Sequence, residues 1–113
     1  MHVQIVTFGL NEISDDEYQE ACRGETGTFA ALPGLLSKIW LKNADANVYG
    51  AVYLWRDRES YQRYVNGEIF ASIGSDPSLK GVASQDFEVI EELTRATQPG
   101  LAVFGAERTR VIA

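Results

Sequence analysis

The chain has 113 residues, of which 45% are hydrophobic, 23% are charged and 11% are aromatic. This profile is typical of a single globular domain and excludes a disordered, collagen-like or low-complexity chain. No apolar run approaches the ~18 residues that a membrane span needs, so we expect no membrane partner. The net charge of -6 repels phosphate backbones and makes nucleic acid a poor partner.

Cysteine and histidine each occur once, as Cys22 and His2. A single cysteine cannot form an internal disulfide, and the start of the chain lacks the pattern of a secretory signal, which favours a cytoplasmic location. One histidine and one cysteine do not make a zinc ligand set. No phosphate-binding glycine loop or nucleophile motif occurs either. We therefore expect neither a metal nor a cofactor.

The first half of the chain predicts a strand, a helix and a hairpin. Residues 2–8 are rich in β-branched side chains and predict the first strand. Ser14 with Glu17 three positions later is a capping-box pattern, and apolar residues at helical spacing continue from there to residue 32. Gly24 and Gly27 weaken this helix, so we expect a bend or a frayed stretch between them. Residues 35–41 and 48–55 predict two strands, which the short connection makes an antiparallel hairpin.

The second half predicts a helix and a strand. Asp57 is placed to cap a helix that Gly67 interrupts, and residues 68–73 add a turn or two. Residues 82–93 alternate between apolar and polar and predict the fourth strand. The order β-α-β-β-α-β predicts an α+β, ferredoxin-like fold: a four-stranded antiparallel sheet with both helices on one face.

We assign residues 1–93 to this domain and residues 94–113 to a C-terminal tail, in which residues 101–104 are a candidate short extra strand. The strand 48–55 has one set of small or aliphatic side chains, which we expect beneath the helices, and one aromatic set. The aromatic set predicts an open sheet face of Gln4, Phe8, Lys38, Trp40, Tyr49, Tyr53 and Trp55.

Such an exposed aromatic face is an association hazard for a monomer. We therefore expect a homodimer in which two copies stack open face to open face and enclose the rings. If that contact is loose, a mostly apolar cavity with a few polar groups remains, which is the usual description of a small-molecule site.

Residues 32–40 (LPGLLSKIW) and 50–60 (GAVYLWRDRES), followed by Tyr61 and Tyr64, resemble the corresponding stretch of YdhR-like monooxygenases. The resemblance covers roughly residues 3–93 and implies membership of the dimeric α/β-barrel superfamily, which includes cofactor-independent oxygenases of quinols and polyketide phenols. The superfamily's catalytic residues do not map onto this chain. A haem-degrading member would need an axial histidine on the second helix, where this sequence has none.

The expected function is that of an oxidoreductase: a cofactor-independent monooxygenase acting on a small aromatic or quinol-like substrate, in a pocket between sheet and helices of a homodimer. A substrate phenol would lose a proton, and its anion would pass an electron to dioxygen in a dry pocket. The candidate catalytic residues are Lys38, which would stabilise the phenolate, with Trp40 and Tyr53. The candidate substrate-binding residues are Gln4, Phe8, Tyr49 and Trp55.

Two other interpretations stay open: a non-catalytic module that binds a small apolar ligand in the same cavity, and a dimerisation unit without a ligand. Several candidates also have a simpler structural role. Trp40 is typical of a core or interface residue, Lys38 of a solvated strand position and His2 of a frayed terminus. Cys22 is typical of a small buried apolar residue.

Overall fold

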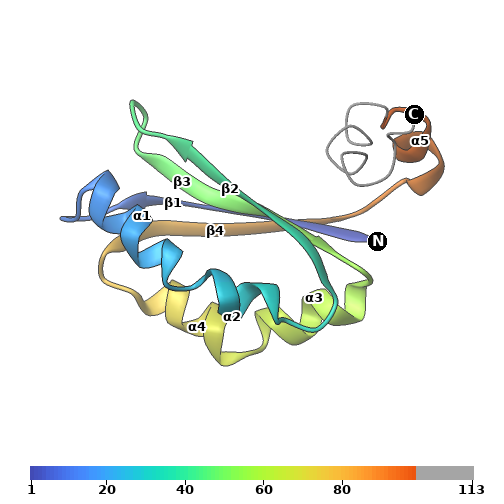
Figure 1. Cartoon of the computed structure of the whole chain (residues 1–113), viewed down its shortest axis with the longest axis horizontal. Helices are drawn as coiled ribbons and strands as arrows, with labels where there is room; N and C mark the ends of the chain where they lie inside the picture. Colours follow the sequence, from blue (N-terminus) through green and yellow to red (C-terminus); the bar gives the residue numbers. More distant parts are fainter. Residues whose placement is uncertain (99–113) are drawn as a thin grey trace.

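The computed structural model describes residues 1–98. Its four-stranded antiparallel sheet has the order β2-β3-β1-β4, and helices α1 to α4 cover one face of the sheet (Figure 1). This confirms the predicted ferredoxin-like α+β fold. None of the described helices combines the length and apolar character that crossing a bilayer requires. The elements are β1 (His2–Leu10), α1 (Asp15–Arg23), α2 (Thr26–Ala30), β2 (Leu35–Asn43), β3 (Val48–Trp55), α3 (Arg58–Val65), α4 (Glu68–Ser75), β4 (Leu79–Glu88) and α5 (Glu91–Ala96).

Both predicted helix starts are confirmed. The Ser14 hydroxyl accepts a hydrogen bond from the Glu17 N–H (3.0 Å), and the Glu17 carboxylate accepts one from the Ser14 N–H (2.8 Å). Asp57 Oδ1 accepts bonds from the Ser60 N–H (2.8 Å) and hydroxyl (2.7 Å). The segment up to residue 32 forms two helices, because α1 ends at Gly24 and α2 follows as a separate short helix. The break lies at the weak stretch that Gly24 and Gly27 predicted.

The last elements differ from the prediction. The fourth strand runs over Leu79–Glu88 instead of 82–93, and residue 93 lies in α5. The alternation of apolar and polar residues does not show that the strand ends at residue 88 and a helix follows. Ile90 and Leu93 are both exposed, so their apolar character does not reflect burial on one face of a strand. The turn or two predicted over residues 68–73 is the helix α4, which continues to Ser75. The division between residues 93 and 94 stays a prediction, although α5 spans it, and residues 101–104 lie outside the described part of the chain.

The aromatic face of the sheet lies beneath the helices, opposite to the prediction. Trp55, Tyr53 and Tyr49 are 0%, 2% and 3% exposed within a single chain. Phe29 of α2 and Tyr64 of α3 pack against the rings of Tyr53 and Trp55 and form the core with them. The prediction that a second subunit buries these rings is therefore wrong.

The opposite, open face of the sheet carries aliphatic side chains and one ring. The strand register places Val52 between Ile5 and Ile39, and Val3 between Leu54 and Phe87. Ile39 and Phe87 are 56% and 49% exposed. We call this surface the open face and define it by Val3, Ile5, Ile39, Leu41, Val52, Leu54 and Phe87.

Candidate active site

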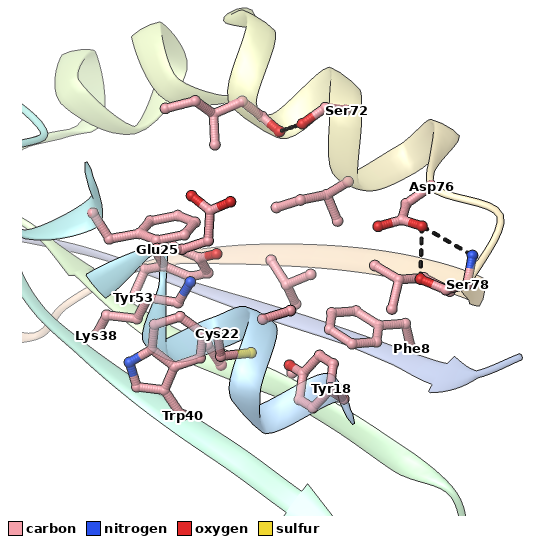
Figure 2. Close-up of a pocket in the computed structure, with 18 of the residues that line it drawn as sticks. Phe8, Tyr18, Cys22, Glu25, Lys38, Trp40, Tyr53, Ser72, Asp76 and Ser78 are labelled. Carbon is pink, nitrogen blue, oxygen red and sulfur yellow. Dashed lines mark hydrogen bonds between the residues drawn. The ribbon is translucent and has the colours of Figure 1, made fainter. Parts of the chain in front are cut away.

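A cavity of about 400 Å³ lies between the sheet and helices α1, α2 and α4 (Figure 2). Its floor is made of small residues, because Val6, Gly50 and Ala51 meet at the centre of the sheet. Gly50 cannot be larger: its φ is +152°, and a Cβ atom there would lie 1.9 Å from the carbonyl oxygen of Val6. The walls are Phe8, Ile13, Tyr18, Ala21, Cys22, Glu25, Phe29, Lys38, Trp40, Tyr53, Ile69, Ser72, Ile73, Asp76, Ser78 and Leu79.

Lys38 of β2 reaches into this cavity among three aromatic rings. Its Nζ lies 3.2 Å from the ring centroid of Phe29, 3.6 Å from that of Trp40 and 4.8 Å from that of Tyr53. These cation–π contacts stabilise the ammonium. None of the ion pairs formed among residues 1–98 involves Lys38.

Burial lowers the pKa of Lys38 to about 7, against smaller upward effects of Cys22 and Glu25. Near neutral pH this side chain is therefore a mixture of ammonium and neutral amine. A neutral amine accepts a proton and an ammonium stabilises an anion, so one side chain supplies both properties that phenol activation needs. The expected solvated position of Lys38 is wrong, because the structure half-buries it in the cavity wall.

Tyr53 keeps its proton in this environment. Burial raises the pKa of its hydroxyl, and that of Tyr64 to about 12. The two hydroxyl oxygens lie 3.0 Å apart in a buried hydrogen bond, and the Tyr53 ring stacks on Trp55 with centroids 5.9 Å apart. Tyr53 is therefore a fixed, neutral side chain whose ring, not its hydroxyl, faces Lys38.

The opposite end of the cavity is bounded by Phe8, Tyr18 and the turn after α4 (Figure 2). The rings of Phe8 and Tyr18 meet edge to face with centroids 5.9 Å apart. Asp76 Oδ1 accepts hydrogen bonds from the Ser78 N–H (2.9 Å) and hydroxyl (2.7 Å), which hold the pKa of this carboxyl below its usual value. The cavity thus has a basic group at one end and an anionic rim at the other.

Four of the seven predicted site residues, Lys38, Trp40, Tyr53 and Phe8, line the cavity. Gln4 and Trp55 do not: both are fully buried, and the Trp55 indole N–H donates to Gln4 Oε1 (3.1 Å). Trp55 instead lines a separate cavity of about 180 Å³ beside α3 and α4.

Tyr49 lines a third cavity of about 280 Å³ at the outer side of α1. Tyr18, Cys22 and Trp40 line this cavity as well as the main one, so they separate the two. Tyr49 adjoins the main site through its strand partner Phe8 and through Tyr18, whose ring centroid is 5.1 Å away.

His2 is not a frayed terminal residue, as its sequence position suggested. It is 6% exposed, its Nε2 lies 2.6 Å from Asp86 Oδ2, and its ring centroid is 5.0 Å from that of Tyr61. The Tyr61 hydroxyl donates to the other oxygen of Asp86 (2.9 Å). His2 lies on β1 beneath α3 and is therefore not part of the cavity wall.

Sequence reasoning missed the helical side of the site. Tyr18, Cys22 and Phe29 were not among the predicted site residues. Their apolar helical spacing could have found them, because it places all three on the side of the helix that faces the sheet. Asp76 in the turn after α4 had no such signal.

The profile of the family described as "Putative mono-oxygenase ydhR" matches residues 3–99. None of the curated proteins matches the sequence. Among solved structures, SnoaB from Streptomyces nogalater, described as a cofactor-independent oxygenase, is 21% identical with a TM-score of 0.61, over 79% of this chain and 93% of that one. A "Putative antibiotic biosynthesis monooxygenase" from Nitrosomonas europaea is 14% identical with a TM-score of 0.64, over 80% of this chain and 99% of that one.

MhuD from Mycobacterium tuberculosis, described as a heme-degrader with two hemes in its active site, is 21% identical with a TM-score of 0.64, over 80% of this chain and 96% of that one. At these identities the likeness concerns the fold alone.

The residues of the cavity wall do not fit a haem group. Haem iron takes an axial histidine, thiolate, thioether or phenolate, and the chain's one histidine is outside the wall. Burial raises the pKa of Cys22 and of Tyr18, which disfavours the anions that would ligate iron. Among residues 1–98 there is also no group of three or more His, Cys, Asp or Glu side chains that could hold a metal ion.

Proposed function

Because the chain belongs to the YdhR family of mono-oxygenases, we propose that it transfers one oxygen atom of O2 to a small aromatic or quinol-like substrate, without a cofactor, in the cavity between sheet and helices. The observation that carries this proposal is Lys38, a basic group with a pKa of about 7 inside an aromatic cavity. A base of that strength is matched to proton transfer near neutral pH.

The reaction starts with proton transfer from the substrate phenol to the neutral amine of Lys38. The ammonium that forms stays beside the phenolate, and the rings of Phe29 and Trp40 hold it there. In a cavity walled by side chains, the charge pair is screened less than in water. Lys38 is thus the proton acceptor and then the counter-ion.

The electron-rich phenolate then reduces dioxygen by one electron. The phenoxyl radical and superoxide couple at a ring carbon, and the peroxide anion that forms takes the proton back from Lys38. The hydroperoxide then loses water to leave a quinone. One oxygen atom ends in the quinone and the other in water, so phenol and O2 give quinone and water. All electrons come from the substrate, and no external reductant is required.

The other predicted site residues act in two ways. Trp40, Phe8 and the ring of Tyr53 are walls against which a substrate ring packs. Trp55 and Gln4 are positioning residues, since Trp55 stacks on the Tyr53 ring and is itself fixed by Gln4. Tyr49 supports Tyr18 from the outer side.

We also propose that two copies associate through the open face, in place of the aromatic contact expected from the sequence. Its aliphatic side chains and Phe87 form an apolar surface larger than isolated exposed residues, and a second copy is the simplest partner that covers it. The cavity lies on the other side of the sheet, so each subunit keeps a complete site. The single cysteine of the chain supports a cytoplasmic location.

Oxygen uptake tests this function directly. The purified protein is mixed with a panel of quinols and phenols in the presence of a metal chelator, and products are analysed after reaction in 18O2. We expect chelator-insensitive oxygen uptake and one labelled oxygen atom per quinone formed. If the same compounds raise Tm without any oxygen uptake, the chain is the alternative, a non-catalytic module that binds small molecules.

A further inference from the structure

Lys38 has a second chemical capacity that proton transfer does not use, because a neutral amine is also a nucleophile. We propose that Lys38 forms a Schiff base with aromatic aldehydes that enter the main cavity. The inference goes beyond the proposed oxygenase reaction, and it makes the cavity a covalent, reversible binding site for carbonyl compounds.

The geometry around Nζ distinguishes Lys38 from the next lysine along the strand. Lys42 lies on the same face of β2, where its Nζ is 2.6 Å from Asp15 Oδ2. Loss of its proton would break that ion pair. Lys38 has no such partner among the described residues, and ring faces surround its Nζ instead.

The surroundings of the two amines shift their pKa values in opposite directions. The Asp15 carboxylate raises the pKa of Lys42, whereas burial lowers that of Lys38 to about 7. The titratable groups that face Lys38 are Cys22 of α1, Glu25 between α1 and α2, and Tyr53 of β3. Cys22 and Glu25 only partly offset the effect of burial.

The aromatic walls select the class of aldehyde. An aromatic aldehyde brings a ring that stacks on Trp40 or Phe29, and a cavity of about 400 Å³ has room for it. The protonated imine is a cation at the position of the former ammonium, so the same three rings stabilise it. A short aliphatic aldehyde gains only the second of these contributions.

The covalent step balances without an oxidant or reductant. The amine nitrogen attacks the carbonyl carbon, the carbonyl oxygen takes a proton, and loss of water from the carbinolamine leaves the C=N bond. Water reverses the reaction. Sodium cyanoborohydride traps the imine, because it delivers hydride to the imine carbon and leaves a stable secondary amine.

The experiment exploits the fact that the chain has three lysines, Lys38, Lys42 and Lys80. The full-length protein is treated with 4-hydroxybenzaldehyde and cyanoborohydride at pH 7 without oxygen, and peptides are mapped by mass spectrometry. Acetaldehyde is the matched probe without a ring. Adducts at the N-terminal amine are counted separately.

We expect Lys38 to carry at least about tenfold more aromatic adduct than Lys42 or Lys80, since a pKa of about 7 leaves a large share of the Lys38 amine neutral at pH 7, whereas Asp15 raises the pKa of Lys42. The preference is expected to shrink with acetaldehyde. Lys38→Arg, which keeps the cation and removes the nucleophile, is expected to lose the selective adduct, with Tm checking its folding. The wild-type map alone already tests the proposal.

Equal labelling of the three lysines, or an unlabelled Lys38, would overturn the inference. Oxygen uptake is measured separately on quinols. Selective labelling without oxygen uptake would contradict the oxygenase proposal and leave the Schiff base standing. Oxygen uptake without selective labelling would contradict the Schiff base and leave the oxygenase proposal standing.

Discussion

At the residue scale, two lysines on one face of one strand show that neighbouring groups determine the pKa of an amine. Lys38 and Lys42 are opposite Tyr53 and Tyr49 of β3, so the sheet presents both toward the helices. Lys42 meets Asp15 of α1, and its pKa rises. Lys38 meets rings, and its pKa falls from an ordinary 10.5 to about 7. The difference arises from the groups that surround each amine: a carboxylate of α1 at Lys42, and rings of α2, β2 and β3 at Lys38.

The lowered pKa of Lys38 predicts a pH-dependent stability. Below pH 7 the ammonium is charged in the folded and the unfolded protein, so its full desolvation cost is present. Between about pH 7 and 10.5 the unfolded chain binds more protons at this position, so stability rises with pH. The stability of Lys38→Met relative to wild type is therefore expected to be highest below pH 7 and to fall steadily above it.

Urea unfolding of both proteins at pH 6, 7, 8 and 9 measures this difference. Lys80→Met, at an exposed position of β4, is the matched control for the loss of one lysine. A difference between Lys38→Met and wild type that stays constant over this range would contradict the assigned pKa.

At the residue scale, part of the site could be predicted from the sequence. Alternation along β1, β2 and β3 grouped Phe8, Lys38, Trp40 and Tyr53 correctly, because a period of two places alternate residues on one face. It did not predict that Trp55 is covered at the other end of the same face. Coverage depends on where the helices pack, and a strand pattern contains no information about that.

At the element scale, the surprise is which face of the sheet the helices cover. We expected the small and aliphatic side chains of β3 beneath the helices, because such side chains are suited to lying under a helix. The helix layer here is broken at Gly24 and Gly67 into short helices, and it carries rings of its own. Phe29 and Tyr64 interlock with the strand aromatics, and the space left over is the cavity. Alternation fixes which residues share a face but leaves the identity of that face open.

The hydrogen bond between Tyr53 and Tyr64 joins β3 to α3 in the core, and it gives a prediction at this scale. Both rings are buried, so removal of one hydroxyl leaves the other without its partner. Tyr53→Phe and Tyr64→Phe are each expected to lower the free energy of unfolding by about 1–2 kcal/mol. The double variant should lose less than the sum, with a coupling energy of about 1 kcal/mol. Strict additivity in urea unfolding would show that the bond does not link the two elements.

At the scale of the whole molecule, the two faces of the sheet have separate tasks in this account. The helix-covered face contains the core and the cavity, and the open face remains for association. A dimer built on the open face leaves both cavities complete, so we expect one ligand per chain. It also leaves Trp55 unaffected, because this side chain is already fully buried in one subunit.

The open face predicts a dimer that a single charge disrupts. Ile39→Lys places an ammonium within the apolar surface, on its β2 side, and it is expected to convert the dimer to a folded monomer at micromolar concentration. Thr28→Lys, on the exposed side of α2, adds the same charge elsewhere and should remain dimeric. Sedimentation velocity distinguishes the two. A wild-type protein that sediments as a monomer would refute the proposed association.

The central claim is that Lys38 takes the substrate proton, and the pH dependence of kcat for oxygen uptake tests it most directly. With a phenol whose own pKa lies well above the range, wild-type kcat is expected to rise through about pH 7 and level off above it. Lys38→Met should lower kcat by about 100-fold or more and remove that inflection. A Lys38→Met protein that keeps the wild-type rate and the same pH profile would show that the proton goes elsewhere.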